Sequence, residues 1–97
     1  MITVPEAQAQ PLARALVSEG LAACVQATPV RSVYRWEDKV EESAEILLIA
    51  KTVDERYPDL EARVRELHPY AVPEITAVQL DRLLPEYSDW LLESTRL

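Results

Sequence analysis

Glycine is almost absent from this chain, which has one glycine, Gly20, against seven prolines in 97 residues. Glycine-rich loops that cradle phosphate groups are therefore excluded, and turns must be built from proline and polar residues. Cysteine is equally scarce, and the single Cys24 leaves no partner for a disulfide within the chain. A reducing compartment is the simplest setting, so we predict a cytoplasmic protein. The sequence also has no signal-peptide pattern and no run of about 18 apolar residues that could span a membrane.

Basic residues are also few, with 10 Lys and Arg against 17 Asp and Glu and a net charge of -7. This balance argues against nucleic acid as a partner, because binding phosphates requires a basic stripe. The length predicts one domain over residues 1–97, and 48% hydrophobic residues suffice for a small core. A domain of this size is often marginally stable alone, and association with other copies is one common remedy.

The spacing of apolar residues and prolines predicts an alternation of strands and helices. The expected elements are a strand at 1–4, a helix from about 8 to 19, a strand at 21–36 with a bulge or bend at Pro29, a turn at 37–39, a strand at 40–51, a helix from 52 to 67, a strand at 74–80 and a last helix from Pro85. This order is the ferredoxin-like plan, an α+β fold with an antiparallel sheet and helices on one face.

Four local signals set the expected helix ends. Pro11 is tolerated only in a first turn, which places the first helix start near residue 8. Gly20 is predicted to end that helix in the left-handed conformation. Thr52 and Glu55 have the spacing of a capping box. The second helix should stop at His68, because the residue before a proline is pushed out of helical geometry.

One long hairpin dominates the middle of the sequence. Its tip, from Tyr34 to Glu45, is acidic and aromatic, and its second arm ends in the apolar run 46–50. Such a hairpin carries more edge than a 97-residue domain can cover, so we predict that the edge belongs to an assembly. The acidic residues favour a solvated, edge-protecting charge run over a cation site, because alternate strand positions scatter them over two faces.

Five blocks of residues match a known family in order and spacing. They are Leu21-Ala22-Ala23-Cys24-Val25, Ser32-Val33-Tyr34-Arg35-Trp36, Lys51-Thr52, His68-Pro69-Tyr70-Ala71-Val72-Pro73-Glu74-Ile75 and Tyr87-Ser88-Asp89-Trp90-Leu91. On these residues the chain resembles the CutA proteins of the divalent-cation tolerance family. The resemblance implies a ferredoxin-like subunit in a PII-like homotrimer whose hairpins extend to neighbouring subunits, and a link to tolerance of copper and other divalent cations. We expect a non-catalytic trimer that binds a metal ion or small ligand near intersubunit clefts. The alternative is a PII-like signalling or scaffold trimer that docks a protein partner.

The resemblance carries one candidate copper ligand onto this chain, His68. Two further ligands proposed in the family fall on Leu67 and Ile2, which cannot bind a metal through their side chains. Stable transition-metal sites need three or four ligands, so one imidazole makes a weak site unless three copies converge. The competing interpretation is a histidine that ends a helix and forms local hydrogen bonds. The first strand also starts several residues later than is usual in the family.

The remaining candidates belong to a ligand pocket or to the subunit interface. Lys51, Tyr70 and Glu74 are the predicted pocket residues, although Lys51 and Glu74 could equally form a structural ion pair. Tyr34, Trp36 and Val40 are the predicted trimer interface, with closure of a cleft as the second role for Trp36. Cys24, in an apolar strand, is predicted to be a buried structural thiol. No catalytic constellation appears, so we do not expect an enzyme.

Overall fold

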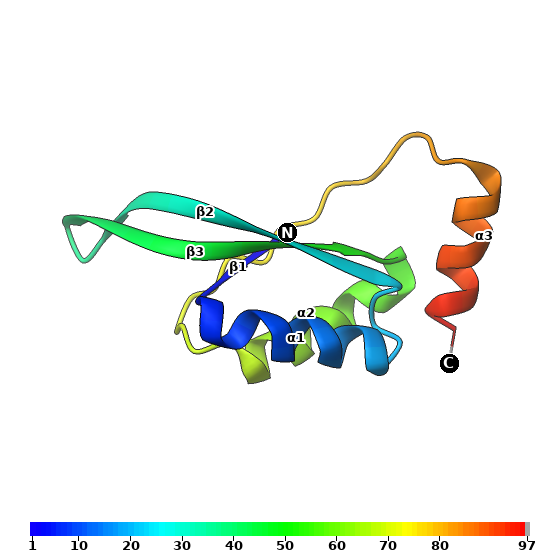
Figure 1. Cartoon of the computed structure of the whole chain (residues 1–97), viewed down its shortest axis with the longest axis horizontal. Coiled ribbons are helices and arrows are strands. Elements are labelled where there is room, and N and C mark those ends of the chain that lie inside the picture. Colours follow the sequence, from blue (N-terminus) through cyan, green and yellow to red (C-terminus); the bar gives the residue numbers. More distant parts are fainter. Residues whose placement is uncertain (97) are drawn as a thin grey trace.

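The fold is a three-stranded antiparallel sheet with two helices against one face, seen in a computed structural model that describes residues 1–96 (Figure 1). The elements are β1 (Ile2–Val4), α1 (Glu6–Ser18), β2 (Cys24–Trp36), β3 (Lys39–Lys51), a short 3-10 turn (Asp54–Arg56), α2 (Tyr57–Leu67) and α3 (Pro85–Ser94). The strand order is β1-β3-β2. The α+β, ferredoxin-like class is confirmed. Within residues 1–96, no helix is long and apolar enough to cross a membrane.

The core lies between one face of the sheet and the two helices. Its side chains come from alternate positions of β1 and β3 and from helix positions three or four apart, as the periods of strands and helices require. The most deeply buried are Ile2, Val4, Leu12, Leu16, Leu48 and Val64. Each such side chain contributes roughly 1.5–3 kcal/mol through removal of its surface from water. This small core is the only deeply buried apolar cluster among the described residues.

The hairpin of β2 and β3 gives the molecule its length. The two strands pair without interruption from Cys24 opposite Lys51 to Trp36 opposite Lys39. Glu37 and Asp38 form the two-residue turn with φ angles of 51° and 63°, which is the type I′ geometry that matches the twist of a hairpin. In Figure 1 this hairpin projects well beyond α1 and α2, and the molecule measures 45 × 26 × 20 Å.

Two proline predictions were wrong. α1 begins at Glu6, so Pro11 lies inside the helix and not in its first turn. Pro11 is exposed, where the carbonyl that loses its helical partner remains open to water. The register also runs through Pro29, opposite Ile46, without a bulge. β2 is an edge strand of this subunit, and a proline is tolerated there because its missing N–H need not join a ladder.

Two further predictions failed after β3. The capping box is absent, because Thr52 donates its hydroxyl to the Leu21 carbonyl at 2.7 Å and α2 has no side-chain cap. The predicted strand at 74–80 is reduced to one bridge between Ile2 and Ile75. Residues 76–84 run as an extended, exposed segment to α3, seen crossing the top of Figure 1. The segment has strand-like sequence, but it runs antiparallel to β1 and passes Met1 after Thr76, so residues 77–80 have no strand beside them among the described residues.

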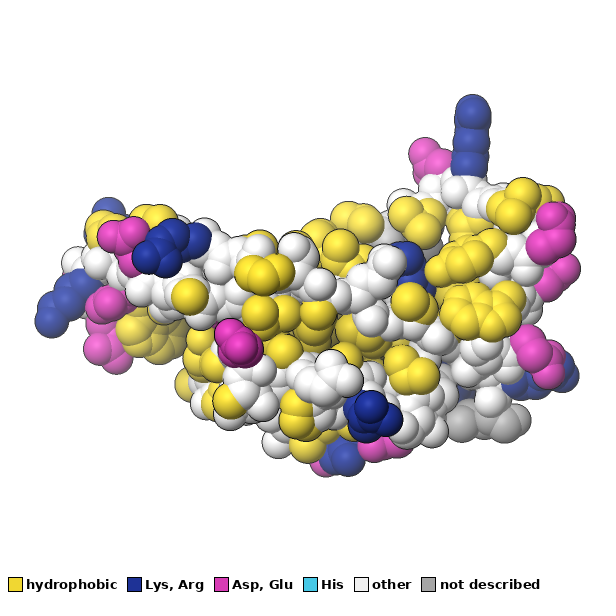
Figure 2. All heavy atoms as spheres, viewed as in Figure 1, with side chains coloured by type: hydrophobic (Ala, Val, Ile, Leu, Met, Phe, Trp, Pro, Cys, Tyr) yellow, Lys and Arg dark blue, Asp and Glu magenta, His cyan; other side chains and the backbone are white. Residues whose placement is uncertain are grey.

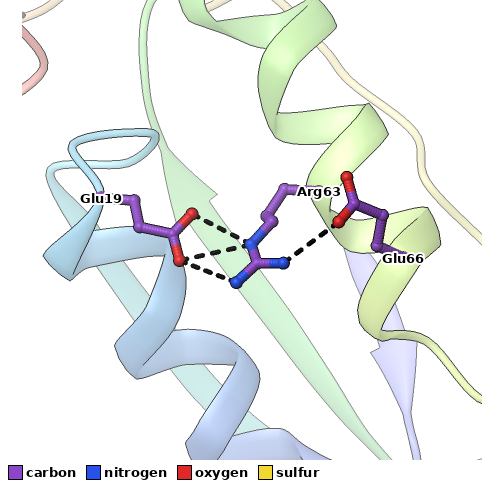
Figure 3. A network of polar contacts seen from close by, with 3 residues as sticks. All are labelled: Glu19, Arg63 and Glu66. Carbon is purple, nitrogen blue, oxygen red and sulfur yellow. Dashed lines mark hydrogen bonds and ion pairs between the residues drawn. The ribbon is translucent and has the colours of Figure 1, made fainter.

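Polar contacts join the two helices outside the core. Arg63 on α2 donates to both carboxylate oxygens of Glu19, at 3.0–3.3 Å, and to Glu66 at 3.2 Å (Figure 3). This pairing raises the pKa of the Arg63 guanidinium, chiefly through the hydrogen bond to Glu19. Gly20 follows Glu19 with a φ of 71°, which confirms the predicted left-handed end of α1.

Candidate functional site

The two faces of the sheet are occupied differently, because side chains point alternately to its two sides along each strand. α1 and α2 cover the face that carries Leu48. The opposite face, here called the open face, is covered by neither helix (Figure 1). Thr3 and Leu47 are paired in register on the open face, and Glu45 lies two positions before Leu47. Polar and aromatic residues of β2 and β3 continue this face toward the hairpin tip.

A hollow of about 450 Å³ lies on the open face, between the hairpin and the loop that follows α2. We call it the open-face hollow. Its principal lining residues are Tyr34, Trp36, Glu45, Tyr70, Val72 and Glu74. The structure therefore brings Tyr70 and Glu74 of the predicted pocket together with Tyr34 and Trp36 of the predicted interface. A volume of this size is within the range of small-molecule sites, roughly 300–1,000 Å³.

Glu45 is the most deeply buried charged group of the hollow, with 6% of its surface exposed. Tyr70 donates its phenol hydroxyl to Glu45 Oε2 at 3.0 Å. Burial first, and then the hydrogen bond and the charge of Glu45, raise the pKa of the Tyr70 phenol above its ordinary value. Tyr70 thus remains a hydrogen-bond donor to the carboxylate across the neutral pH range. Tyr34 is fixed beside it by a 2.9 Å hydrogen bond to Ser43.

His68 is buried next to this hollow, and both of its ring nitrogens have partners. Nδ1 accepts the backbone N–H of Tyr70 at 3.1 Å. Nε2 lies 2.7 Å from the carbonyl oxygen of Thr3, so it carries the hydrogen and donates it. The residue is only 7% exposed. A metal ion would therefore have to displace one of these two hydrogen bonds.

Lys51 and Glu74 are not brought together. Lys51 lines a second hollow of about 490 Å³ near α3, where its ammonium lies 6.0 Å from the centre of the Tyr87 ring. Glu74 accepts hydrogen bonds from the hydroxyls of Thr3 at 3.4 Å and Thr76 at 3.1 Å. No ion pair joins Lys51 to Glu74 in the described part of the chain. Within one subunit, Tyr70 and Glu74 form one candidate site and Lys51 belongs to another.

The predicted interface residues are exposed in the single chain. Val40 is 68% exposed, and Tyr34 and Trp36 are also open to solvent. The extended segment after Ile75 is similar, since Val78 is 71% exposed. Figure 2 shows charged side chains gathered at the hairpin end and apolar ones along the middle and over the α3 end. Cys24, predicted to be buried, is half-buried instead, and its strand partner is Lys51.

Divalent metal ligands do not cluster within one subunit. Among residues 1–96 there is no group of three or more His, Cys, Asp or Glu side chains placed to hold a metal ion. The open-face hollow combines aromatic rings, hydroxyls and a buried carboxylate. These groups can orient and hold a ligand by hydrogen bonds and charge.

Sequence reasoning missed the role of Glu45, which it grouped with the solvated acidic tip. The burial of Glu45 contradicts that grouping for this one residue. Its position beside the apolar run 46–50 was an available signal, because the run enters the covered part of the sheet at that point. Thr3 was also missed, since a threonine in a short strand carries no distinctive pattern.

Comparison with known proteins agrees with these features. The family model described as "CutA1 divalent ion tolerance protein" matches residues 1–94. The chain belongs to the CutA family. A Thermus thermophilus protein named "Divalent-cation tolerance protein CutA" is 50% identical over 97 residues, which cover 98% of this chain and 94% of the relative.

Solved structures of other CutA proteins share the fold. The "PII-like protein CutA" from Nostoc sp. PCC 7120 superposes with a TM-score of 0.95 at 36% identity, covering 99% of this chain and 94% of that one. The "Periplasmic divalent cation tolerance protein CutA" from Archaeoglobus fulgidus gives a TM-score of 0.95 at 35% identity, with 98% and 94% coverage. The family is one of divalent-cation tolerance and PII-like architecture, and it is not known as an enzyme family.

Proposed function

We propose that this CutA chain forms a homotrimer that contributes to divalent-cation tolerance by binding a small ligand or a metal ion near clefts between subunits, without catalysis. The observation that carries this proposal is the uncovered edge of the subunit. The outer edge of β2, in a hairpin of two 13-residue strands, and the extended segment after Ile75 both present strand-like backbone that nothing in residues 1–96 pairs with. Exposed strand edges pair readily with other chains. The hairpin of a neighbouring copy would supply a strand of the right length to pair with such an edge.

The backbone of Thr76 shows which way the segment's edge faces. Thr76 N donates to the Met1 carbonyl at 3.0 Å, and the Met1 amino group donates to the Thr76 carbonyl at 2.6 Å. Backbone polar groups alternate direction along a strand, so the N–H of Ala77 points away from β1. It makes no backbone hydrogen bond to the described residues. A strand from another subunit would use this N–H.

An Ala77→Pro substitution tests the assembly, because it removes that N–H without deleting a bond inside the subunit. We expect the trimer to dissociate, while Ala77→Val, which keeps the N–H, leaves it intact. Light scattering after gel filtration measures the mass of each variant. A trimer that persists unchanged in Ala77→Pro would show that this edge is not used.

The ligand has two candidate places. The open-face hollow offers Tyr70 and Glu74 to a small ligand, and His68 offers an imidazole to copper or another divalent cation if three subunits bring their copies together. The hydrogen bonds that occupy both nitrogens of His68 favour the hollow. Calorimetry with Cu(II) on the native chain and on His68→Ala tests the histidine. Equal heats would remove His68 as the metal site.

A signalling or scaffold trimer is the second candidate function. It is favoured by the exposed carboxylates of Glu41 and Glu42 near the hairpin tip, and by the PII-like description of the Nostoc relative. Reversing both charges to lysine should release a purified protein partner while the trimer remains. Unchanged partner binding, together with ligand density in the open-face hollow, would favour the first function.

We also propose a cytoplasmic location on the basis of the single cysteine. The names of relatives point to several compartments, since one from Archaeoglobus fulgidus is called periplasmic and one from Arabidopsis thaliana is called chloroplastic. Fractionation of cells that produce the chain with its native start would test the location. Recovery outside the cytoplasmic fraction would contradict it.

A further inference from the structure

The loop over residues 69–74 leaves the end of α2 and returns to the free edge of β1. It has little apolar packing of its own, since Tyr70 is 39% exposed and Val72 is 70% exposed. Polar contacts must therefore hold much of this loop on the sheet. His68, at which the loop begins, is a buried polar side chain that makes two of these contacts.

Backbone pairing between β1 and the chain after the loop shows which groups should meet. Met1 and Thr76 exchange two hydrogen bonds, of 3.0 and 2.6 Å. Antiparallel strands alternate such pairs with pairs that exchange none, and the next residues inward form the bridge to β1. Thr3 and Glu74 are then the following pair expected to exchange bonds. Among the described residues, however, the Glu74 N–H forms no backbone hydrogen bond.

The imidazole of His68 takes the place of that N–H. Its Nε2 donates to the Thr3 carbonyl at 2.7 Å, which is the acceptor that the ladder would offer to Glu74. Its Nδ1 accepts the backbone N–H of Tyr70 at 3.1 Å. The residue is 7% exposed, so water has little access to either bond. One ring therefore joins β1 to the first residues after α2.

The tie at Tyr70 extends to β3. Its ring centre lies 4.8 Å from that of His68, and its hydroxyl donates to Glu45 Oε2 at 3.0 Å. At the other end of the loop, the Thr3 hydroxyl donates to Glu74 at 3.4 Å. Tyr70 and Glu74, both predicted to bind a ligand, thus lie on a loop that is held at both ends. All these contacts are within one chain, so they do not depend on assembly.

The imidazole leaves no nitrogen free for a metal ion. The other two ligand positions that the resemblance implies hold Leu67 and Ile2, and residues 1–96 contain no group of three His, Cys, Asp or Glu side chains placed for a metal. Coordination through either ring nitrogen would have to break the bond to Thr3 or the bond to Tyr70. The residues present do not fit a copper centre.

We propose that His68 is a positioning residue and not a metal ligand. Its imidazole replaces the ladder N–H of Glu74 and seats the loop that carries Tyr70 and Glu74. The tautomer with hydrogen on Nε2 is required, because the Thr3 carbonyl can only accept. His68 acts on the candidate ligand site through these two loop residues and does not touch the ligand.

Nitrogen NMR spectra of the ring and amide hydrogen exchange of Tyr70 test the proposal. At neutral pH we expect the native ring to carry hydrogen on Nε2 alone and to keep its signals in equimolar Cu(II). His68→Phe keeps a flat ring but neither hydrogen bond, and should speed exchange of the Tyr70 amide by about tenfold. His68→Asn keeps an oxygen near the place of Nδ1 and should exchange more slowly than His68→Phe. Leu67→Ala, at the exposed neighbouring position, is the matched control and should exchange as the native protein does.

Two results on the native protein would overturn the proposal. One is a ring with hydrogen on Nδ1. The other is loss of the His68 ring signals in equimolar Cu(II), because a paramagnetic ion broadens the signals of nuclei close to it. Tyr70 exchange as slow in His68→Phe as in the native protein would overturn it too. If the variants fail to fold, the two measurements on the native protein decide.

Discussion

The two faces of one sheet have separate tasks in this protein, although the same strands build both. Leu48 points to α1 and α2 and is completely buried, whereas its neighbour Ile49 points to the open side and is 38% exposed. The covered face is apolar and closed within the subunit. The open face carries polar and aromatic groups with a buried carboxylate, Glu45. One residue of shift along the strand therefore separates the closed core from the face that we propose for binding.

The two faces differ in whether residues 1–96 supply their packing partners. The covered face has its partners in the same chain, and changes there should act on folding. The hairpin tip and the segment after Ile75 find few partners among residues 1–96, so under the proposed assembly changes there and on the open face should act on association and binding. Mutations on the two faces test this division.

The largest effect is expected on the covered face. Leu48→Ala leaves a cavity in the core and should lower the free energy of unfolding by roughly 2–5 kcal/mol. Ile49→Ala should cost clearly less inside the subunit, because its side chain already meets solvent. Urea unfolding at several protein concentrations measures both. If both variants lost the same free energy of unfolding, and neither loss varied with protein concentration, the division between the faces would be contradicted.

Truncation at the hairpin tip should act mainly on assembly. Trp36→Ala is expected to weaken association by about 2 kcal/mol or more, as for buried aromatic anchors of interfaces, and to leave helix content unchanged. Val33→Ala is the control, since Val33 lies on the opposite face of the same strand and is exposed. Dilution series followed by light scattering give the association constants. Equal weakening by both changes would show that the interface uses both faces of the hairpin and not mainly the face of Trp36; Val40, on the face of Val33, would then take part as predicted.

A smaller effect is expected where neither face is involved. Gly20→Ala should lower stability by about 1–2 kcal/mol, because an alanine pays a steric penalty at a φ of 71°. No atom lies within 4 Å of the added Cβ, so the loss comes from the backbone and not from a clash. Gly20→Asn should lose less, since asparagine tolerates this conformation. Thermal unfolding of the three proteins checks the order, and an unchanged Gly20→Ala would contradict the strained conformation.

The smallest effect concerns the Tyr70 phenol. Its pKa is raised in the folded state, so its contribution to stability is complete below pH 10 and is lost as pH rises from about 10 through the folded value. Glu45→Gln removes the neighbouring charge and should bring this pKa down toward its ordinary value, although burial still raises it. Absorbance titration of native and variant chains, each compared with Tyr70→Phe, isolates this tyrosine. A Tyr70 pKa that does not move in Glu45→Gln would show that the two groups do not interact.

Much of the fold followed from the sequence because it depends on local chemistry. The period of apolar residues located α2 and β3, and Gly20 located the end of α1. Pro69 and Pro85 correctly located the end of α2 and the start of α3. Pro11 and Pro29 misled, because whether each is tolerated depends on which side of the element faces solvent. The strand predicted at 74–80 failed for a different reason. Its sequence is that of a strand, but strand pairing needs a second strand, and the segment runs past Met1 after Thr76.

The candidate site was predictable only in part. Tyr70 and Glu74 were recognised through the block that follows His68, and the structure places them together. Their grouping with Lys51 did not appear in the subunit, since the end of β3 and the loop after α2 lie at different places on the sheet. The place of Glu45 beside the apolar run 46–50 hinted at its burial, but its role in the hollow depends on a tertiary contact, the hydrogen bond from Tyr70, which the sequence does not reveal.

In the proposed assembly, other copies of the chain complete the open face and the uncovered edges. Sedimentation equilibrium of the native protein tests this directly. We expect one species with three times the 11.0 kDa mass of the chain, stable on dilution to low micromolar concentration. A stable monomer of 11.0 kDa under the same conditions would contradict the claim.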